Sequence, residues 1–409
     1  MQQTQLNLFS SVLHAYGSTG DGRLANPEVY RKVSDAMGLS AEEAEARAPI
    51  GKDGAMRNVL AQRVRWYQQT LKAAGILEHV EGERGVWQLT QPASKDLSQI
   101  QPDVAVLGFS TELGIAILGT CEHVFSRIDA PITLVLTSPP YPLKQTRAYG
   151  NPPEVVYVDW ICRTLEPVVK NMAPGASLCL NVSNDCFLPG SPARSLYRER
   201  LVLALHDRLG LFKMDELIWE NRSKPPGPVQ YASIQRNQLN VAWEPVYWLT
   251  NNPKLVKADN RRVLQQHTER QLALIRGGGE QRDVSNSDGA YVIRPGAYGV
   301  ETAGSIPKNV LSFGHRCSAQ LAYKQAARAM GLPVHGAPMP LKLAKFLVEF
   351  LSAPGDLVVD PFGGSFTTAD AAEQLGRQWL STDCMLEYVL GGSSRFVDRP
   401  GFRQHLKAA

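Results

Sequence analysis

The sequence contains no apolar run long enough to span a bilayer, and its first residues do not combine a basic stretch with an apolar one. We therefore expect a cytoplasmic protein without a membrane partner. Its charge is only mildly unbalanced, with 43 Lys and Arg against 39 Asp and Glu, so net charge alone neither requires nor excludes a polyanionic partner. The 409 residues, 44% of them hydrophobic, suffice for a large core and for more than one domain.

Cysteine is also sparse, and no two of the six cysteines form a Cys-x-x-Cys pair. Zinc centres and dithiol redox sites commonly use that spacing, so we predict reduced, mostly structural thiols and no bound metal. The cysteines are Cys121, Cys162, Cys179, Cys186, Cys317 and Cys384. None of them follows a proline.

Residues 1–95 are predicted to form a domain of their own. The hydrophobic pattern predicts three amphipathic helices, over residues 5–16, 27–37 and 55–74. Asn26 is a favourable N-cap for the second of these helices, and Gly75 closes the third as a C-cap.

A β-hairpin is predicted after these helices, with strands at 76–80 and 86–90 around a glycine-containing turn. Helices followed by a hairpin resemble the winged-helix modules of bacterial restriction and modification enzymes. We therefore expect a winged-helix-like DNA-binding domain in which Arg57 and Arg63 contact DNA. A packing or dimerisation domain is the alternative.

Beyond a polar linker at residues 91–103, strands and helices alternate. Strands are expected at 132–137, 176–182, 214–219, 356–360 and 378–381, and helices at 155–171, 196–209, 340–352 and 368–376. This alternation favours an α/β fold with a doubly wound, mostly parallel, Rossmann-like sheet.

The strand predicted at 132–137 ends abruptly at Ser138-Pro139-Pro140-Tyr141. Proline cannot donate to a strand ladder, so these residues form a rigid loop at the carboxyl end of a parallel strand, where open α/β sheets bind ligands. The loop offers a hydroxyl, carbonyl groups and an aromatic face, a set that suits a flat ring bearing an amine. If this motif is considered by itself, the alternative is a strand end that has no function.

A glycine-containing loop follows the strand predicted at 356–360. Gly363 and Gly364 allow the backbone to approach a ligand, and the following helix presents free N–H groups at its N-terminus. Asp383, about twenty residues past the loop, is placed to accept hydrogen bonds from ribose hydroxyls. This order of a strand, a loop, a helix, a second strand and an acid predicts a binding site for a nucleotide-like ligand.

The two motifs resemble those of the S-adenosylmethionine-dependent DNA methyltransferases that modify exocyclic amines. That family carries (Ser/Asp/Asn)-Pro-Pro-Tyr and Asp-Pro-Phe-x-Gly-Ser-Gly-Thr-Thr, and this chain has Ser-Pro-Pro-Tyr at 138–141 and Asp-Pro-Phe-Gly-Gly-Ser-Phe-Thr-Thr at 360–368. Further matches lie at 216–220, 243–248 and 335–340. The catalytic motif precedes the cofactor motif, which is the order of the permuted β-group.

The resemblance implies that S-adenosylmethionine is the cofactor and that the base is flipped out of the duplex. Hydrogen bonds from the amine to Ser138 Oγ and the Pro139 carbonyl would activate it, with Pro140 completing the loop and Tyr141 stacking on the base. The implied cofactor contacts are Asp360, Phe362, Gly363, Gly364, Ser365, Thr367, Asp383 and Pro340. The absence of a Pro-Cys pair argues against carbon-5 cytosine methylation.

Two positions depart from the family's pattern. Phe366 stands where the family usually has glycine, so the loop must accommodate a Cβ and a ring, and the affinity for the cofactor is expected to change. At Gly119-Thr120, where the family often has Gly-Asp, the acid is missing, so we assign no cofactor contact to Thr120.

Regular alternation fails between residues 224 and 310, and the permuted order makes this insertion the target-recognition region. It separates a catalytic half at 104–223 from a cofactor-binding half at 311–409. The DNA contacts expected in and beside it are Arg222, Lys224, Arg236, Arg261 and Arg262. A solvated loop is the alternative.

The target base is the least determined feature. Serine before Pro-Pro-Tyr favours cytosine N4, but Pro142 stands where those enzymes often have an aromatic residue, and we narrowly favour sequence-specific methylation of adenine N6. RNA or protein-amide methylation and an inactive DNA-binding regulator are weaker alternatives. The expected partners are double-stranded DNA and, from the resemblance, a second copy in a homodimer; any restriction nuclease would be a separate protein.

Overall fold

The computed structural model describes residues 11–12, 15–16, 19, 23–49, 55–73, 77–80, 82–89, 100–143, 152–315 and 317–406. Most of the helix predicted at 5–16, the C-cap predicted at Gly75 and the linker residues 91–99 lie outside the described part. The chain divides into two compact units, one formed by Met1–Lys257 with Val310–Ala409 and the other by Ala258–Asn309.

The N-terminal part has the helices predicted at 27–37 and 55–74 and the predicted hairpin, together with a short helix at Ala41–Glu45 that was not predicted. Its helices are α2 (Asn26–Ala36), α3 (Ala41–Glu45) and α4 (Val59–Ala73), and its sheet has the order β1 (Arg23–Ala25), β5 (Val86–Leu89), β4 (Leu77–His79). A second hairpin, β2 (Arg47–Pro49) with β3 (Met56–Asn58), was not predicted. These elements match the winged-helix-like arrangement expected from the sequence.

The prediction that Asn26 caps α2 was wrong. The helix begins at Asn26 itself, and its N-cap is Ala25, which makes no side-chain capping bond. The Asn26 side chain instead accepts a hydrogen bond of 2.9 Å from Gln68 Nε2, and Gln68 is fully buried on α4. Asn26 therefore joins two helices, since a buried amide is costly unless it is hydrogen-bonded.

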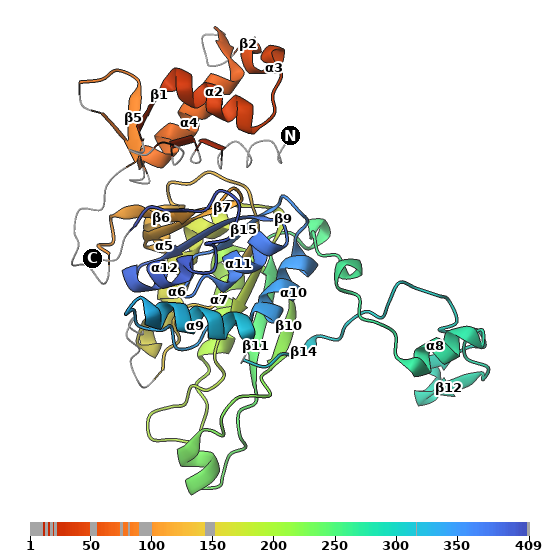
Figure 1. Cartoon of the computed structure of the whole chain (residues 1–409). Coiled ribbons are helices and arrows are strands. Elements are labelled where there is room, and N and C mark those ends of the chain that lie inside the picture. Colours follow the sequence, from red (N-terminus) through yellow and green to blue (C-terminus); the bar gives the residue numbers. More distant parts are fainter. Residues whose placement is uncertain are drawn as a thin grey trace. The chain divides into compact units, whose positions relative to one another are not determined.

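A ten-stranded sheet forms the centre of the larger unit (Figure 1). Its order is β14 (Val310–Ser312), β10 (Phe212–Glu220), β11 (Trp243–Thr250), β9 (Met172–Asn181), β8 (Ile132–Thr137), β15 (Leu357–Asp360), β16 (Gln378–Asp383), β7 (Gly114–Gly119), β6 (Ala105–Ser110), β17 (Arg403–Gln404). The five strands from β9 to β7 run parallel, and β11, β6 and β17 are antiparallel to their neighbours. The hairpin β6–β7 was not predicted.

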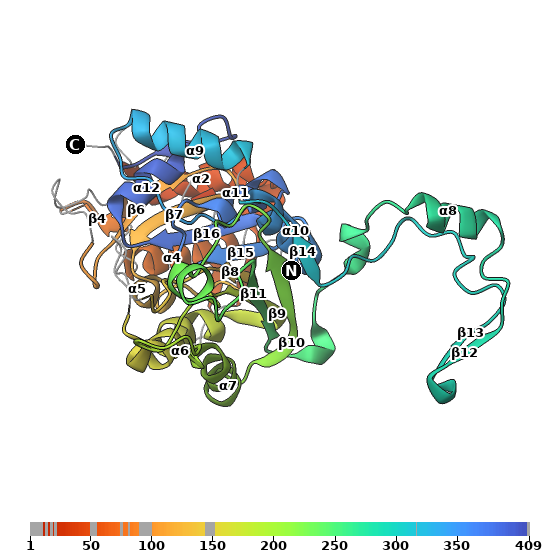
Figure 2. The same cartoon turned by 90° about the horizontal axis from the view of Figure 1, so that it is seen from below.

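Helices cover both faces of this sheet, so the predicted doubly wound α/β fold is confirmed. Figure 2 shows α5 (Cys121–Phe125), α6 (Glu154–Lys170) and α7 (Tyr197–Leu209) on one side. The other side carries α9 (Ser318–Ala329), α10 (Leu341–Leu351), α11 (Thr367–Gln374) and α12 (Leu386–Ser393). Within the described part of the chain, no helix combines the length and the apolar character needed to cross a bilayer.

The predicted insertion at 224–310 contains three different structures. Residues 221–242 connect β10 to β11 and include the short π-helix η1 (Val229–Ile234). The strand β11 then belongs to the central sheet, while the compact unit at 258–309 holds α8 (Glu269–Arg276) and the hairpin of β12 (Val284–Asn286) with β13 (Tyr291–Ile293).

Candidate active site and cofactor cavity

The Ser138–Tyr141 loop follows β8 directly and lies beside the end of β9. Ser138 Oγ is 2.6 Å from Tyr141 Oη, and Tyr141 Oη donates to Asn181 Oδ1 at 3.1 Å. Asn181 is buried at the last position of β9, and its Nδ2 donates to the Pro245 carbonyl on β11. The amide oxygen of Asn181 is thereby aimed at the loop, so this side chain positions the two hydroxyls.

Asp360 ends β15, next to β8 in the sheet. It is 5% exposed, and its Oδ1 accepts hydrogen bonds from Thr137 Oγ1 at 2.7 Å and from the Phe362 N–H at 3.1 Å. Burial raises the pKa of this carboxyl from 3.8 to about 6, although the hydrogen bonds oppose the rise. These bonds join the ends of the two predicted motifs.

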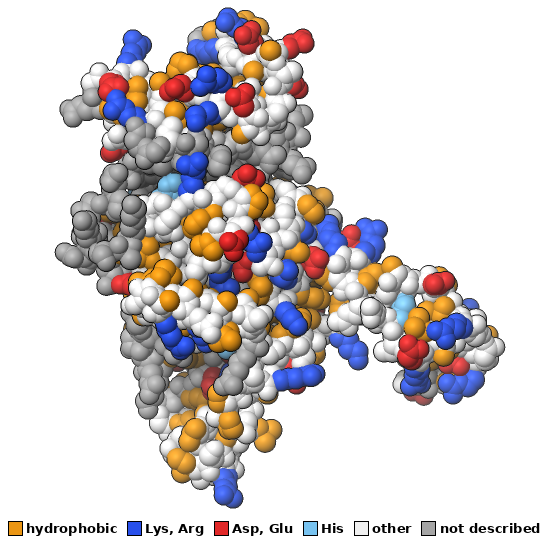
Figure 3. Space-filling model, in the orientation of Figure 1, with side chains coloured by type: hydrophobic (Ala, Val, Ile, Leu, Met, Phe, Trp, Pro, Cys, Tyr) orange, Lys and Arg blue, Asp and Glu red, His pale blue; other side chains and the backbone are white. Residues whose placement is uncertain are grey.

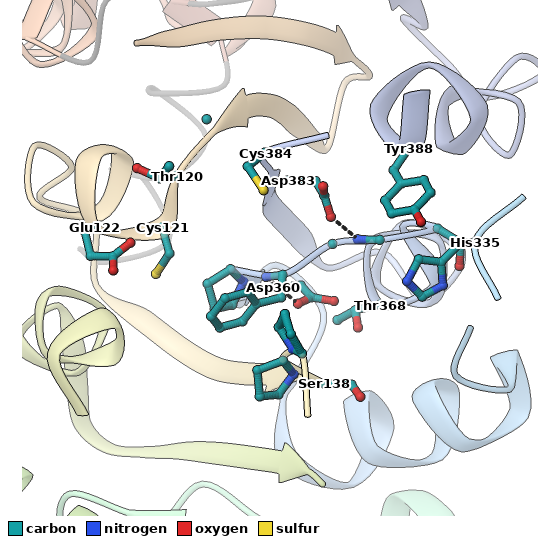
Figure 4. A pocket seen from close by; sticks show the side chains of 18 of the residues that line it. Thr120, Cys121, Glu122, Ser138, His335, Asp360, Thr368, Asp383, Cys384 and Tyr388 are labelled. Atoms are coloured by element: carbon teal, nitrogen blue, oxygen red, sulfur yellow. Dashed lines mark hydrogen bonds between the residues drawn. The ribbon is translucent and has the colours of Figure 1, made fainter. Parts of the chain in front are cut away.

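The glycine loop is fastened to the end of β16. The Gly363 N–H donates to the Thr382 carbonyl at 2.7 Å, and the Gly364 N–H donates to Asp383 Oδ2 at 2.7 Å, the bond drawn in Figure 4. Asp383 Oδ1 accepts from the Met385 N–H at 2.8 Å. Burial raises the pKa of Asp383 to about 6. Each carboxylate oxygen has a second lone pair, so both can still accept from a ligand.

Glycine suits both loop positions. A Cβ at Gly363 would lie 2.5 Å from Ser381 Oγ, and a Cβ at Gly364 would lie 3.1 Å from His335 Nε2. Gly364 also has φ +52°, a conformation that side chains disfavour.

Phe366 adopts the left-handed conformation, with φ 57° and ψ 33°, which explains why glycine suits this position in the family. Its ring is fully buried and packs against Phe109, with the ring centres 5.2 Å apart, and against Gly392. The ring does not line the cavity described below. The expectation of a changed cofactor affinity therefore has no direct steric cause in this structure.

A cavity of about 780 Å³ opens between the two loops (Figure 4). This volume lies within the range of about 300–1,000 Å³ typical of ligand sites. Four acidic residues line it, and none of the described lining residues is Lys or Arg. The acidic residues are Asp103, Glu122, Asp360 and Asp383. An acidic lining favours a ligand that carries positive charge.

The structure brings together all but one of the residues predicted for the catalytic loop and the cofactor. The lining includes Ser138, Pro139, Pro140, Tyr141, Asp360, Phe362, Gly363, Gly364, Ser365, Thr367 and Asp383. Pro340 is the exception: it is the N-cap of α10, and the residues just before it, Ala337, Pro338 and Met339, line the cavity instead.

Several residues at the cavity were missed from the sequence. Glu122, in the first turn of α5, lies two positions after the acid that Thr120 replaces, and it accepts a hydrogen bond from Thr164 Oγ1 at 2.6 Å. His335 and Tyr388 stand edge to face at the other end of the cavity (Figure 4). His335 lay within the recognised stretch 335–340, whereas Glu122 and Tyr388 had no motif to mark them.

A buried arginine supports the cofactor loop from behind. Arg395 Nε donates to the Ser365 carbonyl at 2.6 Å, and one terminal nitrogen donates to Gln320 Oε1 at 2.7 Å. The other terminal nitrogen is 3.4 Å from Asp370, which Arg399 also contacts at 3.5 Å. The Arg395 side chain is 3% exposed, so its planar group holds the loop backbone to α11.

The predicted DNA contacts fall into three groups that differ in charge pairing. Arg57 and Arg63 are exposed in the N-terminal part. Arg222 and Arg236 are exposed in the β10–β11 connection, where Arg222 lies 3.5 Å from Glu220, and Lys224 is part-buried in an ion pair with Glu244 at 3.1 Å. In the smaller unit, Arg261 pairs with Asp259 at 2.7 Å, and Arg262 is half-buried.

Comparison with known proteins gives matches to both parts of the chain. The DNA methylase family model for N6 and N4 methyltransferases matches residues 132–391, and the Mrr N-terminal domain model matches residues 7–99. The type II methyltransferase M.PvuII of Proteus hauseri is 32% identical over 291 residues, which are 71% of this chain and 85% of that protein. The DNA adenine methyltransferase YhdJ of Escherichia coli (strain K12) is 39% identical over 61 residues, 15% of this chain and 21% of that protein.

The solved structure of the PvuII DNA methyltransferase, described as cytosine-N4-specific, superposes with a TM-score of 0.55 and 28% identity. The match covers 71% of this chain and 88% of that chain.

The cavity also fits the cofactor expected from the sequence. S-adenosylmethionine carries a sulfonium and an ammonium, which suit the acidic lining, and a ribose whose hydroxyls can donate to Asp383. Trp160 and Phe362, with ring centres 5.7 Å apart, offer an apolar surface for its adenine. Because the family model covers more than half of the chain, the chain belongs to the S-adenosylmethionine-dependent DNA methylases that act on adenine N6 or cytosine N4.

Proposed function

We propose that this protein methylates the exocyclic N4 amine of cytosine at a specific sequence in double-stranded DNA. The observation that carries the proposal is the hydrogen-bonded group of Ser138, Tyr141 and Asn181 at the mouth of an acidic cavity. The likeness to a cytosine-N4-specific enzyme over 71% of the chain favours cytosine over the adenine preferred from the sequence. The match to an adenine enzyme covers only 61 residues, so adenine N6 is the second candidate.

The loop would activate the amine by accepting its hydrogen bonds. Ser138 has one proton, which it can give to Tyr141 Oη, while Tyr141 gives its own proton to Asn181 Oδ1. Ser138 Oγ then presents lone pairs to one amine hydrogen, and the Pro139 carbonyl accepts the other. These bonds draw the nitrogen lone pair out of the ring, and fixed acceptors of this kind require little rearrangement in the transition state.

When bound, S-adenosylmethionine supplies a methyl group on a positively charged sulfur; the carbon–sulfur bond breaks as the nitrogen–carbon bond forms. Asp360 and Asp383 hold the donor, and Ser138 with the Pro139 carbonyl holds the acceptor, so the chain contributes mainly by positioning. The amine proton is released past Ser138 Oγ to solvent. Tyr141, at the cavity wall, provides the surface on which the flipped base stacks.

Exposed arginines of the N-terminal part and of the β10–β11 connection would supply phosphate contacts, chiefly Arg57, Arg63, Arg222 and Arg236. Binding to duplex DNA should then weaken steeply as salt rises, because each phosphate contact releases counterions.

Nucleoside mass spectrometry of DNA from a methylation-free bacterium expressing the full chain tests the proposal. N4-methylcytosine is the expected product, and N6-methyladenine without N4-methylcytosine would transfer the proposal to the second candidate. Ser138→Ala should abolish the product while leaving cofactor binding intact, as measured by calorimetry. Labelled methyl transfer to RNA but not to duplex DNA would overturn DNA as the substrate.

A further inference from the structure

The segment at residues 100–103, called the strap below, contributes to the wall of the cofactor cavity although it belongs to neither sequence motif. Pro102 and Asp103 line the cavity, as do Thr120 and Cys384. Neither of the two family models matches the strap, so the comparisons assign it no role. Its place at the site follows from the tertiary structure alone.

The strand register shows which end of the cavity the strap occupies. The strands β8, β15, β16 and β7 are parallel neighbours, and their carboxyl ends lead, in this order, to Ser138, Asp360, Asp383 and Thr120. The next strand, β6, is antiparallel, and its first residue pairs with Gly119 of β7, so the strap that precedes β6 lies at the same edge. Asp383 and the start of β6 are two strands apart, about 10 Å at the usual spacing. The strap therefore lies at the end of the cavity opposite to the catalytic loop.

Two hydrogen bonds fix the strap to the neighbouring strand ends. The Ile100 N–H donates to the Cys384 carbonyl at 3.0 Å, just after β16. Thr120 Oγ1 donates to the Pro102 carbonyl at 3.0 Å, just after β7. Figure 4 shows Thr120 and Cys384 at the end of the cavity away from Ser138. Thr120 stands where the family often has an acid, and its hydroxyl proton is used here to hold the strap.

The Asp103 carboxylate is available to a ligand. It is exposed, and it makes no hydrogen bond or ion pair with the part of the chain that the structure describes. The other three acidic residues of the lining, Glu122, Asp360 and Asp383, each accept a hydrogen bond from within the protein. Asp103 is thus the lining carboxylate with the largest open capacity to accept hydrogen bonds.

The negative charge of the cavity is a local property of the molecule. On the face drawn in Figure 3, acidic and basic side chains are intermixed. The described lining of the cavity, in contrast, contains four acidic residues and no Lys or Arg. The strap contributes one of these four residues and extends the acidic lining past the end of β7.

The orientation of the cofactor determines which of its groups reaches the strap. Its methyl group faces Ser138, where the acceptor amine is held, and its ribose hydroxyls donate to Asp383. In S-adenosylmethionine the ribose lies between the sulfur and the adenine, so the adenine extends from Asp383 away from Ser138 and toward the strap. Its exocyclic amine has two N–H donors, and a donor that leaves water without gaining an acceptor weakens binding.

We propose that Asp103 accepts a hydrogen bond from the exocyclic amine of the cofactor's adenine and thereby supplies the acid that is missing at Thr120. The strap suits this role because its two hydrogen bonds hold Asp103 at the adenine end of the cavity. The inference deepens the proposed methylation by naming a residue that selects the cofactor. It rests on the family's use of S-adenosylmethionine and does not depend on which base is methylated.

Calorimetry of the full chain with two ligands tests the inference. The ligands are S-adenosylhomocysteine, the demethylated cofactor, and S-inosylhomocysteine, in which a carbonyl replaces the exocyclic amine. The wild-type chain should bind the adenine compound about ten- to hundredfold more tightly, because hydrogen bonds to charged groups are the stronger ones. In Asp103→Ala the affinity for the adenine compound should fall until the two ligands bind nearly equally. Asp103→Asn keeps an acceptor oxygen without the charge and should retain part of the preference.

The matched control is Asp398→Asn, an exposed carboxylate outside the cavity, which should keep the full preference. An unchanged preference in Asp103→Ala would overturn the inference, and so would an equal loss of affinity for both ligands. Loss of the preference in Glu122→Gln but not in Asp103→Ala would overturn it by giving the role to the other acid. Because both ligands are measured without DNA, a chain that methylates no DNA contradicts the proposed function and not this inference.

Discussion

The structure predicts that neutralising the Asp360 carboxyl raises the stability of the protein but weakens its binding of the cofactor. The carboxyl is 5% exposed and accepts from Thr137 Oγ1 and from the Phe362 N–H. Burial raises its pKa from 3.8 to about 6, so the folded protein holds this proton more tightly than the unfolded chain does. Ionisation of Asp360 at neutral pH therefore reduces the free energy of unfolding.

The size of the effect follows from the change in pKa. Between pH 4 and pH 6 the folded state binds more protons than the unfolded state, so stability falls as the pH rises through this range. By pH 8 the loss approaches about 3 kcal/mol. In Asp360→Asn the side chain is neutral at every pH and keeps an oxygen that can accept both hydrogen bonds. We expect the free energy of unfolding of this variant to exceed that of the wild-type chain by about 1–3 kcal/mol at pH 8. At pH 4 the two should differ little.

Urea unfolding followed by tryptophan fluorescence at pH 4 and pH 8 measures this difference, with Asp398→Asn, an exposed carboxylate outside the cavity, as the control. Calorimetry should show that Asp360→Asn binds S-adenosylmethionine about ten- to a hundredfold more weakly, because a charged hydrogen bond contributes about 1.5–3 kcal/mol. If Asp360→Asn were less stable than the wild-type chain at pH 8, or if its stability changed equally at both pH values, burial would not be the cause of the raised pKa. Unchanged cofactor affinity would refute the role of the acidic lining.

Substitutions of Phe366 and Arg395 test the side chains that pack behind the cofactor loop. Phe366→Gly should lower the free energy of unfolding by about 2–4 kcal/mol, since the lost ring outweighs the relieved positive φ, and should leave the cofactor Kd within a few-fold. A large change in Kd with unchanged stability would contradict the placement of this ring in the core. Arg395→Lys should weaken cofactor binding about tenfold, because a lysine cannot reproduce the planar fork that holds the Ser365 carbonyl, whereas Arg399→Lys should bind normally. Equal effects of the two lysine substitutions would contradict a positioning role for Arg395.

The larger part of the fold could be predicted because the sequence patterns that mark its strands and loops lie within a few residues of one another. The strand at 132–137 is a continuous apolar run stopped by two prolines, and the structure ends β8 at Thr137 as expected. The strand at 378–383 and its preceding glycine loop were likewise set by short-range pattern. The hairpin β6–β7 was missed because every residue of both strands is buried, so it shows no alternation, and no proline marks its strand ends as Pro139 and Pro140 mark the end of β8.

The sequence by itself determined the class of chemistry, methyl transfer to an exocyclic amine, since two loops with the required residue types, in the required order, identify the family and its cofactor; it did not decide between adenine N6 and cytosine N4. The tertiary structure decided which other side chains meet them. Asn181 reaches Tyr141 only because β9 lies beside β8, and Phe366 avoids the cavity only because its left-handed backbone turns the ring toward Phe109. Such contacts join residues far apart in the chain, and they follow from strand order and packing, which no local pattern records.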